Sequence, residues 1–125
     1  MKVADCMTPD PACVAPDDFL TAAIKLMETG DFRAVPVISD GKLVGIVSDR
    51  DIRKHWQRRE STKIGAIMSE NPICISPDDT VNDAIRMLLS YKIGGLLVIS
   101  KDKLVGILTT TDILKTVLGL PELDQ

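Results

Sequence analysis

Two seven-residue segments combine a glycine, a hydroxyl side chain and an aspartate at the same spacing, GIVSDRD (45–51) and GILTTTD (106–112). In each, the hydroxyl of Ser48 or Thr109 stands three residues before Asp51 or Asp112. An ionised carboxylate suits a pair of neighbouring hydroxyl donors, and such charge-assisted hydrogen bonds contribute roughly 1.5–3 kcal/mol each. A helix is expected to begin here, and its N-terminus offers unpaired backbone N–H groups to an anion. Both segments are therefore candidate ligand-binding sites.

The same spacing has a second interpretation, because it is close to a capping box. In that motif a hydroxyl and an acid three residues later each bond to the other's backbone N–H group. A capping box prefers the longer Glu or Gln at its last position, whereas both segments carry Asp. This preference favours ligand contact in at least one segment, and capping and binding are compatible with each other.

Catalytic chemistry finds little support in the sequence. The only histidine, His55, lies in the basic stretch KHWQRRESTK (54–63), away from any nucleophile. The chain has neither a metal-ligand cluster nor the spacing of a phosphate-binding P-loop. We therefore expect no enzymatic activity and no required cofactor.

An internal duplication organises the whole chain. A shift of 61 positions aligns residues 3–53 with residues 64–114 without a gap, and 18 of the 51 pairs are identical. A unit of about 50 residues buries its own sheet and helices poorly, so we expect the two copies to share a core with pseudo-two-fold symmetry. We divide the chain into repeat 1 (1–53), a helix end and linker (54–63), repeat 2 (64–116) and a C-terminal tail (117–125).

Each copy predicts the same β-α-β-β-α order, and hence an α/β fold. A short extended piece (12–15 or 73–76) leads to a helix whose start we place at Pro-Asp-Asp, since proline suits the first helical position and aspartates suit the positive end of the helix dipole. Two β-rich runs follow, 34–39 and 43–47 in the first copy, joined by Asp40-Gly41, which is typical of a hairpin. A second helix begins near Ser48 or Thr109 and carries Ile52 or Ile113 inward.

Composition indicates a globular protein with no membrane span. Hydrophobic residues make up 45% and charged residues 26%, and the longest run without a polar residue is seven residues, where a span needs roughly 20. The net charge of −3 argues against nucleic-acid binding by bulk electrostatics, although the basic stretch at 50–59 leaves a weak case for it. Three cysteines cannot all pair within the chain, which indicates reduced thiols and a cytoplasmic location.

The repeat resembles a pair of CBS domains, the modules named after cystathionine β-synthase. The motifs that carry the resemblance are MTPDPACVAPDD and MSENPICISPDD, followed by AVPVISDGKLVGIVSDRDI and GLLVISKDKLVGILTTTDI. Together they cover nearly the whole chain except its last ten or so residues. The resemblance implies a regulatory, ligand-sensing module that binds AMP, ADP or ATP, or in some members S-adenosylmethionine, in a cleft between the two repeats. It also implies a homodimer, and some members of the family bind no ligand.

The family's motif then assigns the site residues. Asp51 and Asp112 would accept hydrogen bonds from the ribose hydroxyls, and Ser48 and Thr109 would contact phosphate. Arg33 and Arg50 would reach the phosphates. The remaining residues that the resemblance places at the nucleotide are Cys13, Val14, Ala34, Val35, Pro36, Cys74, Ile75 and Thr111. For Cys13 and Cys74 an equal alternative is a small buried hydrophobic residue.

The two copies differ at positions that matter for this assignment. Gly94-Gly95 replace Arg33-Ala34, and Leu97 replaces Pro36, so the second site would bind a different ligand or none. The helices are more apolar than one small core requires, at Leu26, Met27 and residues 87–89, which agrees with a homodimer. A scaffold with empty clefts is the competing function. A regulated partner protein is also expected.

Overall fold

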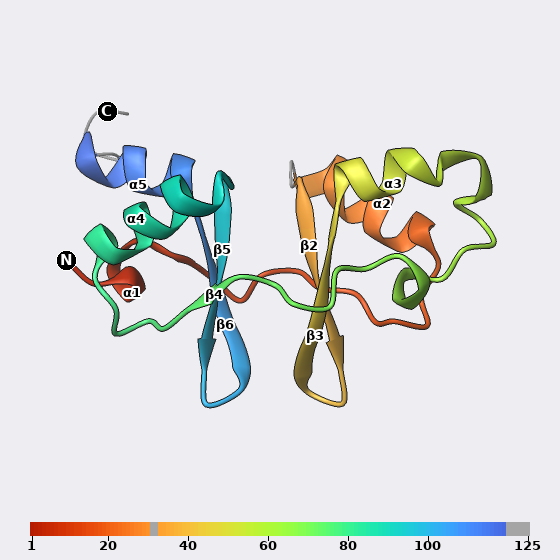
Figure 1. Cartoon of the computed structure of the whole chain (residues 1–125), viewed down its shortest axis with the longest axis horizontal. Coiled ribbons are helices and arrows are strands. Elements are labelled where there is room, and N and C mark those ends of the chain that lie inside the picture. Colours follow the sequence, from red (N-terminus) through yellow and green to blue (C-terminus); the bar gives the residue numbers. More distant parts are fainter. Residues whose placement is uncertain (31–32, 120–125) are drawn as a thin grey trace. The chain divides into compact units, whose positions relative to one another are not determined.

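The computed structural model describes residues 1–30 and 33–119. Each copy contains a helix, a two-stranded hairpin and a second helix in the predicted order (Figure 1). They are α1 (Val3–Cys6), β1 (Thr8–Pro9), α2 (Leu20–Gly30), β2 (Ala34–Ser39), β3 (Lys42–Ser48), α3 (Asp49–Lys54), η1 (Trp56–Arg58), η2 (Ile64–Ala66), β4 (Cys74–Ile75), α4 (Val81–Tyr91), β5 (Gly95–Ser100), β6 (Lys103–Thr109) and α5 (Thr110–Val117). The predicted mixed α/β fold is confirmed. No helix in the described ranges is long and apolar enough to cross a membrane.

The chain divides into two compact units, which we call unit 1 (residues 1–11 and 73–125) and unit 2 (residues 12–72). In unit 2 the hairpin β2–β3 carries the helices α2 and α3, and Val14 adds a parallel bridge to Val37 of β2. Its core is formed by buried side chains from all of these segments, among them Val14, Leu20, Val35, Ile52 and Ile64. The predicted α-β-β-α part of the order is present in unit 2, whereas the extended piece predicted at 12–15 contributes only the single bridge at Val14.

Unit 1 repeats this arrangement with a more complete sheet. Its strands lie in the order β1-β6-β5-β4, where β4 is parallel to β5 and the other neighbours are antiparallel. The helices α4 and α5 pack on the hairpin β5–β6 (Figure 1). Leu96, Val98 and Leu108 from the strands meet Leu88 and Ile113 from the helices in its core.

The opening segments of the two sequence repeats are exchanged between the units: residues 1–11 pack in unit 1 with most of repeat 2, and residues 64–72 pack in unit 2 with most of repeat 1. Val3 is fully buried in the core of unit 1, and its N–H donates to the carbonyl of Asp79 over 2.8 Å. Ile64 is fully buried in unit 2, and its N–H donates to the carbonyl of Asp18 over 2.8 Å. The compact units therefore cut across the repeat boundaries drawn from the sequence. These exchanged residues complete the apolar cluster of each unit.

The Pro-Asp-Asp segments form turns rather than the first helical turn, which corrects the prediction. Asp18 accepts a hydrogen bond from the N–H of Ala15 over 2.9 Å, and α2 begins only at Leu20. In the second copy Asp79 accepts from Ser76 in the same way, and the N-cap of α4 is Thr80. An aspartate satisfies the backbone locally here, and so the chain turns before the helix starts.

The hairpin turns agree with the prediction. Asp40 and Gly41 both have positive φ angles, of 52° and 78°, as a tight two-residue hairpin turn requires. The second copy places Lys101 and Asp102 in the same left-handed region, at 52° and 66°. Each hairpin brings the end of its second strand, at Ser48 or Thr109, beside the start of its first strand.

Candidate functional site

The aspartate of each motif lies at the first turn of a helix, directly after a strand. In unit 2, Ser48 is the last residue of β3 and the N-cap of α3, and it pairs with Ala34 across the hairpin. The carbonyl of Arg33 accepts a hydrogen bond from the N–H of Asp49 over 2.8 Å. This bond fixes the residues just before β2 beside the start of α3. Ser48, Asp51, Arg33 and Ala34 are therefore brought together.

Ser48 and Asp51 form a complete capping box. The N–H of Ser48 donates to Oδ2 of Asp51 over 2.9 Å, and the N–H of Asp51 donates to Oγ of Ser48 over 3.1 Å. The capping box that the sequence left open as an alternative is therefore present, with Asp in place of the more usual Glu or Gln. Asp51 is half-buried, and its Oδ1 has no hydrogen-bond partner within the described part of the chain. The box therefore orients one carboxylate oxygen and leaves the other available.

Unit 1 has the same box with one addition. The N–H of Thr109 donates to Oδ2 of Asp112 over 2.9 Å, and the N–H of Asp112 donates to Oγ1 of Thr109 over 3.1 Å. The hydroxyl of Thr8 also donates to Oδ1 of Asp112 over 3.3 Å. Both carboxylate oxygens of Asp112 therefore have a partner.

The sequence analysis missed Thr8 and its equivalent Ser69 in the other copy. Each of them lies opposite the residue that follows the motif glycine, since Thr8 pairs with Ile107 and Ser69 pairs with Ile46. A Cβ atom on Gly45 would lie 2.7 Å from the carbonyl oxygen of Ser69, and one on Gly106 would lie 3.0 Å from that of Thr8. The absence of a side chain on the motif glycine therefore lets the backbone of the exchanged segment approach this closely. The sequence did contain an indication of this pair, because the 61-residue shift aligns the hydroxyl residues Thr8 and Ser69.

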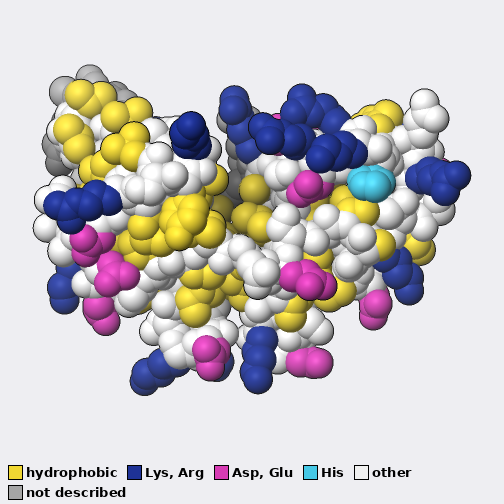
Figure 2. Space-filling view, viewed as in Figure 1, with side chains coloured by type: hydrophobic (Ala, Val, Ile, Leu, Met, Phe, Trp, Pro, Cys, Tyr) yellow, Lys and Arg dark blue, Asp and Glu magenta, His cyan; other side chains and the backbone are white. Residues whose placement is uncertain are grey.

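The cationic side chains near the site of unit 2 are exposed. Arg33 lies just before β2, and Arg50 and Arg53 lie on α3. The ion pairs among the described residues are Lys2–Asp78, Lys63–Asp17 and Arg86–Asp83, and so none of these three arginines takes part in one. Figure 2 shows Lys and Arg side chains gathered over α3. The corresponding positions of unit 1 hold Gly94, Thr111 and Leu114.

Three of the predicted site residues have side chains in the apolar cores. Val14 is 6% exposed, Val35 is 1% exposed and Ile75 is 5% exposed. The N–H of Val14 donates to the carbonyl of Pro36, and its carbonyl accepts from Ile38. These residues shape each unit and present no polar side chain to a ligand. Pro36 is likewise buried, and Thr111 is exposed on α5.

The two matched cysteines differ in environment. Cys13 is exposed, and so its interpretation as a small buried hydrophobic residue is wrong. Cys74 lies half-buried in β4, and burial raises the pKa of its thiol. Its protonated form is a weak nucleophile. Cys6 is partly buried and packs against the core of unit 1. The described residues contain no group of three metal-ligating side chains.

The chain belongs to the CBS domain family, whose model matches residues 3–58 and 64–119. Inosine-5'-monophosphate dehydrogenase of Korarchaeum cryptofilum is 34% identical over 105 residues, which are 83% of this chain. The chain spans 22% of that enzyme and 23% of the corresponding enzyme of Methanocaldococcus jannaschii. The relationship to these enzymes therefore concerns one portion of their length.

Two solved structures share the fold and contain adenosine ligands. CBSX2 in complex with AMP has a TM-score of 0.83 and 29% identity, and the match covers 95% of this chain and 97% of that chain. The CBS domain pair of protein MJ0100, in complex with 5'-methylthioadenosine and S-adenosyl-L-methionine, has a TM-score of 0.85 and 27% identity over the same shares of the two chains. The predicted family is confirmed.

Proposed function

We propose that the chain is a regulatory module that senses an adenosine nucleotide, AMP, ADP or ATP, at its CBS motifs. The observation that carries this proposal is the arrangement of Asp51. Its Oδ2 is fixed by the N–H of Ser48, while Oδ1 has no partner among the described residues. A half-buried, oriented carboxylate oxygen with free lone pairs is suited to accept hydrogen bonds from the 2' and 3' hydroxyls of a ribose.

The polar and cationic groups near Asp51 suit a ligand that carries phosphate next to its ribose. The hydroxyl of Ser48 accepts a bond from the N–H of Asp51, and so its own proton is left to donate to a phosphate oxygen. Arg33 and Arg50 are exposed and can supply charge-assisted bonds to further phosphates. Cys13, which is exposed, and Ala34, which is half-buried, would contact the base.

The relatives support an adenosine moiety as the common element. AMP, 5'-methylthioadenosine and S-adenosyl-L-methionine all contain adenosine, and they occur in structures with 29% and 27% identity to this chain. Phosphate is absent from the last two ligands. We therefore expect the ribose contact at the aspartates to serve every adenosine ligand. The phosphate contacts would determine which of these ligands binds most tightly.

The two copies would differ in what they bind. In unit 1 the bond from Thr8 occupies Oδ1 of Asp112, and Gly94 and Thr111 stand where unit 2 has arginines. We infer a weaker site at Asp112, with Thr109, Thr111, Cys74 and Ile75 around it. A ligand with less negative charge, such as S-adenosylmethionine, suits this half better than ATP.

A structural dimerisation or adaptor domain without nucleotide is the second candidate. The complete capping boxes favour it, because they satisfy Ser48, Asp51, Thr109 and Asp112 without any ligand. Under either function we propose a homodimer in the cytoplasm that acts on a regulated partner protein and is not itself an enzyme.

Isothermal titration with AMP, ADP, ATP and S-adenosylmethionine tests the proposal. We expect micromolar binding of at least one nucleotide, and we expect Asp51→Asn to weaken it about tenfold, which is about 1.4 kcal/mol. Asparagine can still accept the bond from Ser48, and so thermal unfolding should be nearly unchanged. Asp112→Asn is the matched control and should change nucleotide affinity less. No binding by any of the four ligands would favour the adaptor.

A further inference from the structure

Four cationic side chains lie close together in the sequence where α3 ends and η1 follows it. They are Arg53, Lys54, Arg58 and Arg59, and we call them the basic cluster. Arg53, Lys54 and Arg58 are exposed, and Arg59 is half-buried. Figure 2 shows Lys and Arg side chains gathered over this part of unit 2. Since the net charge of the chain is −3, the basic cluster is a positive patch on a protein that is acidic as a whole.

The cations of the basic cluster are not neutralised by the protein itself. None of the ion pairs in the described part of the chain includes a member of the cluster. A single surface cation needs no partner, because water solvates it. Four cations between positions 53 and 59 repel one another, however, and like charges this close lower the stability of a helix. An anionic partner would relieve this repulsion.

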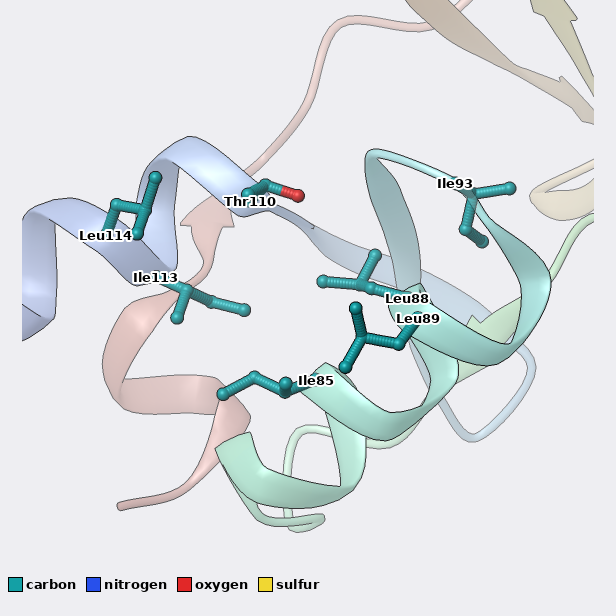
Figure 3. A pocket seen from close by; sticks show the side chains of 7 residues that line it. All are labelled: Ile85, Leu88, Leu89, Ile93, Thr110, Ile113 and Leu114. Carbon is teal, nitrogen blue, oxygen red and sulfur yellow. The ribbon is translucent and has the colours of Figure 1, made fainter.

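The fold does not require this charge, because the second copy lacks it. The 61-residue shift aligns Arg53 with Leu114 and Arg58 with Gly119. Leu114 lines an apolar pocket between α4 and α5, where it lies across from side chains of α4 (Figure 3). Of the four equivalent positions in the second copy, only Lys115 carries a cation. The basic cluster is therefore a feature of the first copy and not of the repeat.

An exposed aromatic ring lies within the basic cluster. Trp56 is 44% exposed, and the guanidinium carbon of Arg59 lies 4.3 Å from the centre of its ring. Nη1 of Arg59 also donates to the carbonyl of Trp56 over 2.8 Å. The cation–π contact and the hydrogen bond hold Arg59 in one orientation and leave its other N–H groups available. A guanidinium held in this way loses little conformational freedom when it binds a carboxylate.

We propose that the basic cluster, together with Trp56, is the surface on which the regulated partner protein docks, through a segment rich in Asp and Glu. Three of the four cations are arginines, which bind carboxylates through two parallel hydrogen bonds. The indole ring adds apolar contact area beside these charges. This inference rests on the regulated partner of the proposed function, and it does not depend on which nucleotide binds.

The dimensions of the basic cluster suit a short acidic segment. The path from Arg53 to Arg59 spans at most about 12 Å at the rise of an α-helix or a 3₁₀ helix. An extended peptide covers this length with about four residues, and an α-helix covers it with about two turns. One face of either segment can therefore place a few carboxylates over the cluster.

Acidic side chains bound the cluster on both sides, and this favours a peptide over a nucleic acid. Asp49 and Asp51 precede the cluster in α3, and Glu60 follows it. A nucleic-acid strand carries a phosphate at every nucleotide, and its affinity rises with the number of phosphates that cations neutralise. A strand longer than the cluster would meet these carboxylates. A protein segment can carry its acidic residues only where the cluster lies.

Helix α3 joins the basic cluster to the candidate nucleotide site. Asp51 lies in the first turn of this six-residue helix, and Lys54 is its last residue, about one helical turn further on. The helix that the partner would contact therefore also carries the aspartate proposed to bind the ribose. This arrangement favours the regulated protein as the occupant of the surface.

Titration with a labelled oligoglutamate peptide tests the docking surface on the native chain. We expect saturable binding by fluorescence anisotropy at low ionic strength, and we expect added salt to weaken it because the cations are exposed. Lys54→Gln combined with Arg58→Gln should weaken binding about fivefold, with an unchanged circular dichroism spectrum, through the loss of two exposed ion pairs. Lys42→Gln combined with Lys103→Gln is the matched control. It removes the same charge from exposed positions beside the hairpin turns and should leave binding nearly unchanged.

The fluorescence of Trp56 locates the bound peptide, because this is the only tryptophan in the chain. Unlabelled oligoglutamate should change its emission with the same dissociation constant that anisotropy gives. Nucleotide titration of the variant with Lys54→Gln and Arg58→Gln should match that of the native chain. This comparison separates the docking surface from the proposed nucleotide site.

The absence of oligoglutamate binding at low ionic strength would overturn the proposal, as would equal weakening by the two double variants. Tighter binding of a labelled oligouridylate with the same net charge as the peptide would also overturn it and would assign the basic cluster to nucleic acid. A native chain that binds oligoglutamate at Trp56 but binds no nucleotide would support the docking surface and contradict only the nucleotide part of the proposed function.

Discussion

The hydroxyl of Thr8 donates a hydrogen bond to the carboxylate of Asp112 over 3.3 Å, although 104 residues separate them in the chain. Thr8 belongs to the N-terminal segment of repeat 1, and Asp112 to the GILTTTD segment of repeat 2. One bond thus connects the exchanged segment with the candidate site. Asp51, the matching aspartate, receives no such bond from Ser69 among the described residues.

This difference predicts unequal effects of removing the two hydroxyls. Thr8→Val should lower the free energy of unfolding by about 0.5–1 kcal/mol, because an exposed hydrogen bond to a carboxylate is lost. Ser69→Ala should change it by less than that. Urea denaturation of both variants measures the difference. Equal effects would mean that the Thr8 bond does not contribute to stability.

The motif glycines predict a larger effect on stability. Gly45→Ala places a Cβ atom 2.7 Å from the carbonyl oxygen of Ser69, a backbone atom that cannot rotate away. The strand or the exchanged segment must move, and overpacking of this kind lowers the free energy of unfolding by about 1–3 kcal/mol.

Gly94→Ala provides the control for this prediction. A Cβ atom on Gly94 would meet nothing within 4 Å. We therefore expect the Gly94→Ala protein to unfold at nearly the same urea concentration as the native chain. Urea denaturation compares the two variants. A Gly45→Ala protein as stable as the native chain would show that the glycine is not required for the close approach.

The order of elements could be predicted from the sequence because each depends on local patterns. The β-rich runs and the Asp40-Gly41 turn predicted β2 and β3, and the hydroxyl of Ser48 predicted the start of α3. The starts of α2 and α4 were wrong by four residues, since the prediction placed Pro16 and Pro77 at the first helical position and the helices begin at Leu20 and Val81. There the aspartates of Pro-Asp-Asp bond to the backbone of the preceding turn, and this choice depends on fine geometry rather than on residue type.

The exchange of segments between repeats could not be predicted from one copy. The tandem repeat shows that residues 3–11 and 64–72 are equivalent, but not which copy each one packs on. Val3 is equally apolar in either place, and only the assembled structure shows that it is buried beside α4. The Thr8–Asp112 bond was missed for the same reason. The exposure of Leu114 and Val117 could not be predicted either, since a helical pattern alone does not say which apolar residues remain at the surface.

The end of α4 predicts a stabilising substitution. Lys92 caps this helix in the left-handed conformation, with a φ of 56°. A side chain costs roughly 1–2 kcal/mol there, whereas glycine adopts this region freely. Lys92→Gly should therefore raise the free energy of unfolding by about 1 kcal/mol.

Lys25→Gly provides a control of opposite sign. Lys25 lies inside α2, where glycine should lower the free energy of unfolding by about 1 kcal/mol. Thermal unfolding of both variants should show the midpoint rising for one and falling for the other. A fall for both would contradict the assignment of Lys92 as a strained cap.

The thiol of Cys74 predicts both a labelling order and a pH dependence. Burial raises the pKa of this thiol, and so less of it is thiolate at any given pH. With iodoacetamide near pH 8, the exposed Cys13 should react first and Cys74 should react slowly until the protein unfolds. Mass spectrometry of peptides from the native chain and from Cys13→Ser gives the order directly. Faster labelling of Cys74 would contradict its half-buried position in β4.

The same shift changes stability at alkaline pH. In the folded state Cys74 holds its proton to a higher pH than in the unfolded state, whose thiol titrates at about 8.5. Its contribution is therefore complete below that pH and is lost as the pH rises through it, because the unfolded chain then binds fewer protons than the folded one. The free energy of unfolding should fall above about pH 8.5, and Cys74→Ser should reduce that fall. An identical pH profile for the native chain and for Cys74→Ser would show that other groups cause the alkaline loss.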